Sequence, residues 1–236
     1  MKQFDREALE RHAHMIRRNI VHTVATNGEG HAGGALSAAD AIAVLFFGVM
    51  NFKPDDPLGR DKFLLSAGHK CLALYGALVE AGVIDEKELK TYNELGTIFP
   101  GHPDATKIPA IDFSTGSLGH GLPVACGYAL AAKRLGLDYK TYVLMGDGEQ
   151  GEGSIWEAAA VAAQHKLDNI ICILDENTLQ INGRTNEVCK PADYEDRYAA
   201  TGWAVKTVAD GHDVGALYEA IASAPFEPGK PSIIVA

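Results

Sequence analysis

Length, composition and charge limit the kind of protein that this chain can be. The 236 residues are 47% hydrophobic, and 21 basic against 31 acidic side chains give a formal net charge of −10. A chain of this length can bury a complete hydrophobic core and is typical of one α/β domain. The negative charge argues against nucleic acid or an anionic membrane as the main partner. Because the chain has no run of 18 apolar residues and its N-terminal segment is too polar for a signal peptide, we expect a cytoplasmic protein.

Two helical segments open the chain. Helical periodicity runs from Arg6 to Ala25, and a second, more apolar helix is expected from Ser37 to Val49. Ser37 is expected to cap this second helix, with Asp40 at the N3 position.

Short apolar runs then alternate with helical segments. The expected strands cover Lys62 to Leu65, Thr141 to Met145, Ile170 to Leu174, Trp203 to Val208 and Ser232 to Val235. The expected helices cover Lys70 to Ala81, Gly119 to Arg134, Ser154 to His165 and Asp213 to Ser223. This alternation predicts an α/β fold, with a parallel sheet of about five or six strands flanked by helices on both faces. We expect residues 1–236 to form a single domain with one long loop at about 93–117, a length typical of functional or mobile loops.

The cysteines do not form a recognisable metal or redox motif. None of the four has C-x-x-C spacing, and the first three stand in apolar surroundings, so buried reduced thiols are the favoured interpretation. The four are Cys71, Cys126, Cys172 and Cys189.

Two polar motifs begin where expected strands end. Asp147 lies in the glycine-rich segment 146–153, and Asn177 follows the next strand along the chain. Ligands of open α/β sheets bind at the carboxyl ends of the strands, so both side chains should reach one crevice. Magnesium prefers oxygen ligands that it shares with a phosphate, and glycine lets the backbone approach a diphosphate closely. The pair predicts a magnesium-diphosphate site, whereas the glycine-rich turn alone would equally suit a helix with an acidic cap.

Four histidines stand beside glycines at expected junctions between loops and helices. They are His31, His69, His102 and His120. A single histidine of this kind is more often a core or surface residue, but four together predict a polar pocket where imidazoles meet ligand oxygens. The other histidines lack this context and are interpreted as structural or solvated. They are His12, His14, His22, His165 and His212.

Six motifs occur in the order seen in transketolases. They are Gly-His-x-Gly-Gly at 30–34, Leu-Ser-Ala-Gly-His at 65–69, Pro-Gly-His-Pro at 100–103, Ser-Thr-Gly-Ser-Leu-Gly-x-Gly at 114–121, Gly-Asp-Gly-x-x-x-Glu-Gly at 146–153, and Asn-x-Leu-x-Ile-x-Gly at 177–183. From about residue 10 to its end, the chain resembles the separately encoded N-terminal, diphosphate-binding subunit of a split transketolase.

The resemblance implies a cofactor and a set of contacts. Transketolases use thiamine diphosphate with Mg²⁺, in whose place Ca²⁺ or Mn²⁺ can stand. The implied metal ligands are Asp147, Asn177 and the carbonyl of Leu179. The implied cofactor contacts are His69, Gly116, Ser117, Leu118, His120, Gly148, Glu149 and Ile181. Ile181 would wall the thiazolium ring, and His120 stands where full-length transketolases have glutamine, as resembles split subunits.

The resemblance also implies catalytic residues. His31 and His102 match histidines that reach the hydroxyl and carbonyl oxygens of the sugar, where they can donate hydrogen bonds or shuttle protons. Glu152 and Glu157 match glutamates at the subunit interface between active sites, where buried carboxyls share protons. Ordinary acidic residues at a helix start are the alternative for both.

The resemblance further implies that this chain holds half of an active site. The glutamate that activates the cofactor comes from a second, pyrimidine-binding domain, and no segment here resembles it. We therefore expect a partner subunit carrying that domain, self-association of this chain, and sugar phosphate substrates. The expected activity is transfer of a two-carbon ketol unit from a ketose phosphate to an aldose phosphate. The alternatives are a related thiamine diphosphate enzyme, of the deoxyxylulose phosphate synthase or modified-sugar type, and a noncatalytic scaffold.

Overall fold

A five-stranded parallel sheet forms the centre of the protein. The structure is a computed structural model that describes residues 3–181, 183–189 and 193–236. The sheet order is β1-β2-β3-β7-β6, and every neighbouring pair is parallel. The strands are β1 (Lys62–Leu65), β2 (Thr141–Gly146), β3 (Ile170–Asp175), β6 (Ala204–Thr207) and β7 (Ser232–Val235). The expected α/β fold with a helix-covered parallel sheet is confirmed.

Alternate residues of each strand serve two separate hydrophobic cores. On β2, Tyr142 and Leu144 join the core on one face, whereas Val143 and Met145 join the core on the other. Successive side chains of a strand point to opposite faces, so a strand covered on both faces must be apolar throughout. This requirement explains the continuous apolar runs that predicted the strands.

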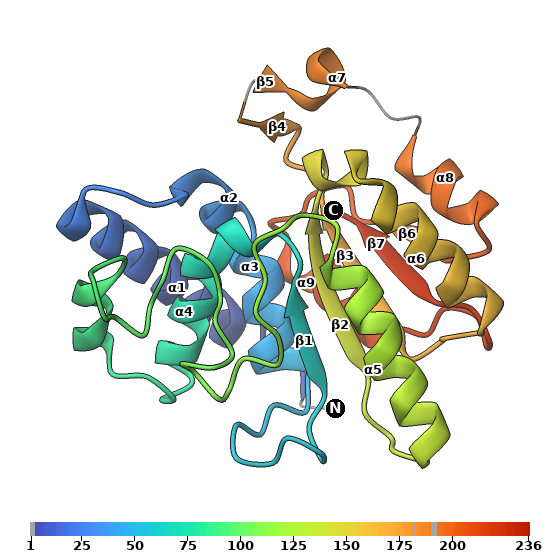
Figure 1. The fold of residues 1–236 in the computed structure, drawn as a ribbon, viewed down its shortest axis with the longest axis horizontal. Helices are drawn as coiled ribbons and strands as arrows, with labels where there is room; N and C mark the ends of the chain where they lie inside the picture. The colour runs from blue at the N-terminus through green and yellow to red at the C-terminus, as the bar shows by residue number, and fades with distance from the viewer. Residues whose placement is uncertain (1–2, 182, 190–192) are drawn as a thin grey trace.

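Helices cover both faces of the sheet, as Figure 1 shows. One core is built with α1 (Arg6–Asn27), α2 (Ala32–Ser37), α3 (Ala39–Ala43), its π-helical continuation η1 (Val44–Val49), α4 (Cys71–Glu80) and α9 (Val214–Ala222). The other core is built with α5 (Gly121–Leu135), α6 (Gly153–Gln164) and α8 (Tyr194–Ala200). No helix of the described residues is both long enough and apolar enough to span a membrane.

Short elements connect the sheet to the helices. They are the 3-10 turns η2 (Gly68–Lys70), η3 (Glu86–Thr91) and η4 (Gly148–Gly151), the strands β4 (Leu179–Gln180) and β5 (Gly183–Arg184), and the helix α7 (Thr185–Val188). The β4–β5 hairpin and α7 project beyond the C-terminal ends of the central strands (Figure 1). The carboxyl ends of β2 and β3 therefore lie close to this hairpin.

The expected cap at Ser37 is wrong. Ser37 is the last residue of α2, and its hydroxyl donates to Asp175 Oδ1 at 2.8 Å instead of capping a helix. The next helix, α3, begins after Ala38 without a side-chain cap. Asp40 accepts hydrogen bonds from Arg17, so a tertiary ion pair takes the carboxylate that the sequence pattern assigned to the cap.

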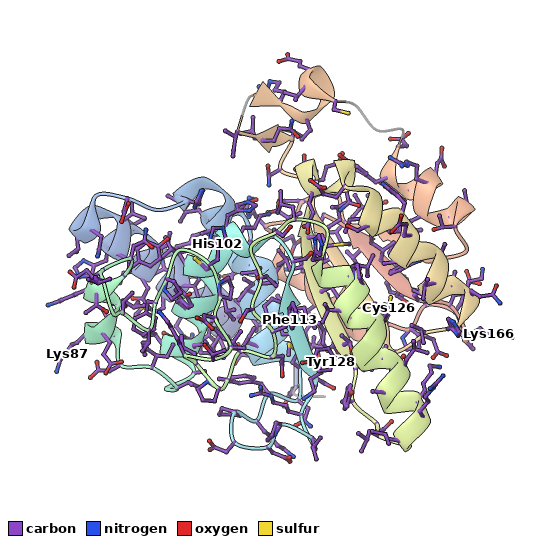
Figure 2. The ribbon with its side chains drawn as sticks, viewed as in Figure 1. Lys87, His102, Phe113, Cys126, Tyr128 and Lys166 are labelled. Carbon is purple, nitrogen blue, oxygen red and sulfur yellow. The ribbon has the colours of Figure 1, made fainter. Side chains whose placement is uncertain are left out.

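The long loop has no regular secondary structure between Thr91 and Gly121. Its course is fixed by α4, because the Tyr75 hydroxyl donates to the carbonyls of Pro100 at 2.9 Å and of His102 at 3.1 Å. The thiol of Cys71 contacts the Gly101 carbonyl at 3.1 Å. Figure 2 shows His102 on this loop beside the helical layer that contains α2 and α4. The first three cysteines are buried free thiols, as expected, and Cys189 is exposed.

Candidate active site

A pocket of about 870 Å³ lies at the carboxyl ends of the central strands. Its walls come from α2, the end of β3, the β4–β5 hairpin and residues 209–212 after β6. His31, His69, Asn177, Leu179 and Ile181 line this pocket. Five of the residues singled out from the sequence therefore share one cavity, at the sheet edge where α/β proteins bind ligands.

Asp147 lies at the end of β2 with its carboxylate held by protein donors. Its side chain is 2% exposed, and its oxygens accept hydrogen bonds from the Gly148 amide at 2.9 Å and the Thr185 hydroxyl at 3.1 Å. The Tyr194 hydroxyl donates to the Asp147 carbonyl at 3.2 Å. Burial raises the pKa of Asp147, and its hydrogen bonds, including one from the Thr178 amide, oppose that rise. The contact with Thr178 brings the turn after β3 against Asp147.

Asn177 forms a tight turn next to Asp147. Its Oδ1 accepts from the Leu179 amide at 3.0 Å, and Thr178 takes a left-handed φ of 63°. The hairpin that follows leaves Leu179 59% exposed and Ile181 96% exposed, which is unusual for apolar side chains at a pocket wall. An amide oxygen, a buried carboxylate and an open apolar wall are thus assembled along one edge.

His31, His69 and His102 form a cluster. The ring centroids of His31 and His69 are 5.7 Å apart, and those of His31 and His102 are 6.2 Å apart. Burial, the Lys70 ammonium and the other two histidines lower the pKa of His69 to about 4. Burial and His31 lower the pKa of His102 as well. Neutral imidazoles can both donate and accept hydrogen bonds, so the cluster is suited to handling ligand oxygens near neutral pH.

The glycine-rich loop at 115–119 packs closely on this cluster. A Cβ built on Gly116 would lie 3.6 Å from the His102 ring, and one on Gly68 would lie 2.8 Å from Thr115 Oγ1. Thr115 Oγ1 is buried and has no hydrogen-bond partner among the described residues. A buried hydroxyl without a partner is expensive, so its presence here fits a polar ligand that completes the site. Ser117 is exposed and Leu118 is half-buried on the same loop.

Glu149 has a different role from the cofactor contact that the resemblance implied. Its side chain is 2% exposed, and its carboxylate accepts from the Ser66 hydroxyl, from the Gly119 amide at 2.8 Å and from the Gly146 amide at 3.1 Å. These bonds join the ends of β1 and β2 to the 115–119 loop. Because protein donors occupy the carboxylate, it positions the surrounding backbone instead of facing the pocket.

Three further sequence candidates lie outside the pocket. His120 is exposed, and its Nδ1 lies 3.1 Å from the Leu118 carbonyl. Glu152 and Glu157 are both exposed in the single chain, at the start and on the surface of α6. The expectation of buried carboxyls therefore does not hold within one chain, since no element of this chain covers them.

The structure adds pocket residues that sequence patterns missed. Asp175, at the end of β3, accepts from Ser37 and forms a buried ion pair with Lys70. His212, interpreted from the sequence as structural or solvated, lines the pocket and lies 2.7 Å from Asp40, which also pairs with Arg17. None of these residues belongs to a short motif, and only the tertiary fold brings them together.

A buried polar network supports the turn that carries Asp147. The Gln150 side chain is completely buried, donates to the Gly146 carbonyl at 3.1 Å and accepts from the Tyr198 hydroxyl at 2.7 Å. The Trp156 indole donates to the Gln150 carbonyl at 2.9 Å. The ring of Tyr198 also lies 5.1 Å from Trp156 and 5.3 Å from Trp203, measured between centroids. The turn is therefore fixed from below by α6 and α8.

The donor set fits a metal that shares its shell with a diphosphate. Among the described residues, no group of three or more His, Cys, Asp or Glu side chains has the geometry to hold a metal ion by itself. A carboxylate and an amide oxygen fit magnesium, which takes one or two protein groups and completes its shell with phosphate and water. A Cβ on Gly148 would lie 3.0 Å from Gln180 Oε1, so the backbone approach beside Asp147 has room only for glycine.

Comparisons with known proteins agree with this arrangement. The family described as "Transketolase, thiamine diphosphate binding domain" matches residues 9–236. An apulose-4-phosphate transketolase subunit of Phocaeicola vulgatus is 42% identical over 231 residues, which cover 97% of this chain and 82% of the relative. A 6-deoxy-6-sulfo-D-fructose transketolase subunit of a Clostridium species is 39% identical over 229 residues, covering 96% of this chain and 83% of the relative.

Solved structures show the same fold. The transketolase from Leishmania mexicana superposes with a TM-score of 0.92 at 34% identity, covering 96% of this chain and 36% of that chain. The transketolase from Campylobacter jejuni gives a TM-score of 0.90 at 32% identity, covering 99% and 38%. This chain thus spans little more than a third of these solved structures.

The fold and the family match define an α/β domain of the thiamine diphosphate-binding class. The chain belongs to the transketolase family, and the resemblance inferred from its motifs is confirmed.

Proposed function

We propose that this chain is the diphosphate-binding subunit of a split transketolase, which binds thiamine diphosphate through Mg²⁺. The observation that supports this proposal is the meeting of the Asp147 turn, the Asn177 turn and the histidine cluster at one pocket. Asp147, Asn177 and the Leu179 carbonyl are the proposed metal ligands, and Ca²⁺ or Mn²⁺ are expected substitutes. We also propose that the protein acts in the cytoplasm.

The cofactor is proposed to lie between the histidine cluster and the hairpin. His69 and the backbone of Gly148 would contact the diphosphate, whereas the 116–118 backbone and the exposed Ile181 would contact its central part. Thiamine diphosphate, when bound, supplies the carbanion stabilisation that carbon-carbon cleavage requires. The protein contributes binding, orientation and proton handling around it.

His31 and His102 are the proposed catalytic residues of this chain. His31 is exposed at the N-terminal end of α2, and His102 is held above it by the long loop. Both rings can donate hydrogen bonds to sugar oxygens or move a proton at those oxygens. A histidine with a lowered pKa, such as His102, is neutral at pH 7 and therefore available to accept a proton.

A partner subunit is proposed to complete the site. Leu179 and Ile181 expose apolar surface at the pocket wall, which fits a site that a second polypeptide closes. The apulose-4-phosphate relatives are named as single subunits of their enzymes, which supports a partner with the pyrimidine-binding domain. Self-association is proposed through the surface of α6 near Glu152 and Glu157, whose exposed carboxyls a second copy would then cover.

The substrates are proposed to be a ketose phosphate donor and an aldose phosphate acceptor. Modified sugars are the favoured alternative, because the relatives include subunits named for apulose 4-phosphate and for 6-deoxy-6-sulfo-D-fructose. The experiment is ketol transfer with Mg²⁺ and thiamine diphosphate, using the chain alone, the product of the neighbouring gene alone, and the mixture. A panel of donors should include xylulose 5-phosphate and both modified sugars.

Activity only in the mixture is the expected result, and the preferred donor then identifies the substrate. Activity of the chain alone would contradict the half-site proposal. Asp147→Ala should abolish magnesium-dependent binding of thiamine diphosphate by calorimetry, because it removes the buried carboxylate ligand. A mixture whose turnover is unchanged by Asp147→Ala would favour a scaffold role instead.

A further inference from the structure

One buried carboxylate joins three elements that each carry a proposed site residue. Asp175 ends β3, two residues before Asn177. Its Oδ1 accepts from the hydroxyl of Ser37, which ends the helix that begins after His31, at 2.8 Å. Its Oδ2 accepts from the ammonium group of Lys70, the residue next to His69. Asp175 is therefore a common junction for the segments that carry His31, His69 and Asn177.

Lys70 is enclosed along its whole length. It is 1% exposed, whereas lysine is almost never fully buried without a partner. A Cβ on Gly34 would lie 3.3 Å from Lys70 Cγ, and one on Gly146 would lie 3.6 Å from its Nζ. The side chain thus passes between α2 and the end of β2, and reaches Asp175 beneath the pocket. Its ammonium also acts on His69 and on Asp147.

We propose that Asp175, bound to Lys70 and Ser37, is a positioning residue that fixes the histidine side of the pocket against the Asn177 side. This inference rests on the proposed function. The junction contributes by holding His69 and the metal-binding turn at the separation that a magnesium-diphosphate group requires. Neither Asp175 nor Lys70 is a metal ligand or a catalytic residue in this proposal.

The cost of the ion pair supports a positioning role. A buried ion pair contributes little net stability, because the desolvation of two charges offsets their attraction, and apolar replacements are often as stable. A fixed, directional contact between charged groups nevertheless selects one arrangement of the segments that carry them. Partners that orient metal ligands typically contribute about 10- to 100-fold to metal affinity. The junction should therefore matter more for ligand affinity than for folding.

The test separates positioning from folding with a pair of variants. Lys70→Met leaves the carboxylate of Asp175 buried with one donor, so both thermal stability and affinity should fall. Lys70→Met combined with Asp175→Asn removes both charges, so the thermal midpoint should return toward that of the unchanged chain. Affinity for thiamine diphosphate with Mg²⁺, measured by calorimetry, should stay about 10-fold weaker in the double variant. Recovery of affinity together with stability would overturn the proposal.

Lys62→Met is the matched control. Lys62 is also buried, and it pairs with Asp112 at 3.6 Å at the opposite end of β1. This variant should change stability without changing affinity. An affinity loss equal to that of the double variant would show that any buried lysine of this sheet matters, and would contradict a specific role for Asp175.

Ser37 supplies a milder test with a conservative rescue. Ser37→Ala removes one hydrogen bond to Asp175, and Ser37→Thr keeps the hydroxyl. Affinity should fall several-fold in the first variant and remain unchanged in the second; equal affinities in both would overturn the Ser37 link. If the unchanged chain, mixed with its partner, fails to bind thiamine diphosphate with Mg²⁺, the proposed function fails instead of this inference.

Discussion

Thr185 Oγ1 donates a hydrogen bond to Asp147 Oδ2 at 3.1 Å, and thereby joins the segment after the hairpin to the turn after β2. Thr185 is 7% exposed and begins α7. This bond orients one of the two oxygens that a metal would bind. Thr185→Val keeps the shape of the side chain and removes the hydroxyl, so affinity for Mg²⁺ with thiamine diphosphate should fall by about 1 kcal/mol in binding free energy.

The control for Thr185→Val is Thr207→Val. The Thr207 hydroxyl also donates to a carboxylate, that of Glu195, at 3.0 Å on the exposed surface. Titration calorimetry should show a loss for the first variant, retention for Thr185→Ser and no change for the control. Equal affinity of Thr185→Val and the unchanged chain would contradict the orienting role.

Gly68→Ala should disturb the site through backbone contact. The added methyl group would lie 3.0 Å from the Gly116 amide nitrogen as well as close to Thr115, so the 115–116 backbone must move away from His69. Overpacking of this kind typically costs about 1–3 kcal/mol of unfolding free energy. Chemical denaturation measures the cost, and Gly127→Ala is the control because its methyl group meets nothing within 4 Å. Similar stability of both variants would show that the loop is easily displaced.

Stability should fall in acid partly because of His69. Its pKa is about 4 in the folded chain and 6.5 in its ordinary state, so the unfolded chain takes up the proton first as pH decreases. The contribution of His69 is therefore fully present above pH 6.5 and is lost as pH falls toward 4. Because the ring is only half-buried, solvent screening makes the loss smaller than the pKa difference alone implies.

Denaturation of the cofactor-free chain at pH 7 and pH 5 measures this contribution. His69→Gln removes the titrating group, so its unfolding free energy should decrease less between the two pH values than that of the unchanged chain. An identical decrease would mean that other groups, such as the buried Asp147 and Glu149, account for the acid sensitivity.

Thiol reactivity should distinguish one cysteine from the rest. Burial raises the pKa of Cys71 to about 12 and that of Cys126 to about 11, and Cys172 is fully buried with a raised pKa. The reactive species is the thiolate, so these three should react only on unfolding. Cys189 is exposed, and a thiol reagent should label one group rapidly in the native chain. Cys189→Ser should abolish that phase; its persistence would show that a buried thiol becomes accessible.

The apolar strands could be predicted closely because they are covered on both faces. The expected bounds of β1 and β7 agree with the structure at every residue, and β2 and β3 each extend by one residue. The half-exposed strand β6 is shorter than the expected Trp203 to Val208, since its polar residues carry a weaker signal. The helix α8 and the hairpin were not predicted, because short elements stabilised by tertiary contacts have little periodicity of their own.

The candidate site was predictable only where short motifs carry it. His31, His69 and Asn177 stand in such motifs and line the pocket, whereas Asp175, Lys70 and His212 depend on contacts between distant segments. Glu149 lies inside a motif but faces backbone donors, which residue order alone cannot reveal. Residues that orient others are recognised from three-dimensional contacts.

The network around Gln150 gives the protein a built-in optical probe. The chain contains two tryptophans, and both pack on Tyr198, whose hydroxyl binds the residue three positions after Asp147. The guanidinium of Arg197 lies over the Trp156 ring at 3.5 Å from its centroid. Any shift of the Asp147 turn must therefore change the surroundings of an indole. Intrinsic fluorescence can report cofactor arrival in real time, without a label and before any sugar is turned over.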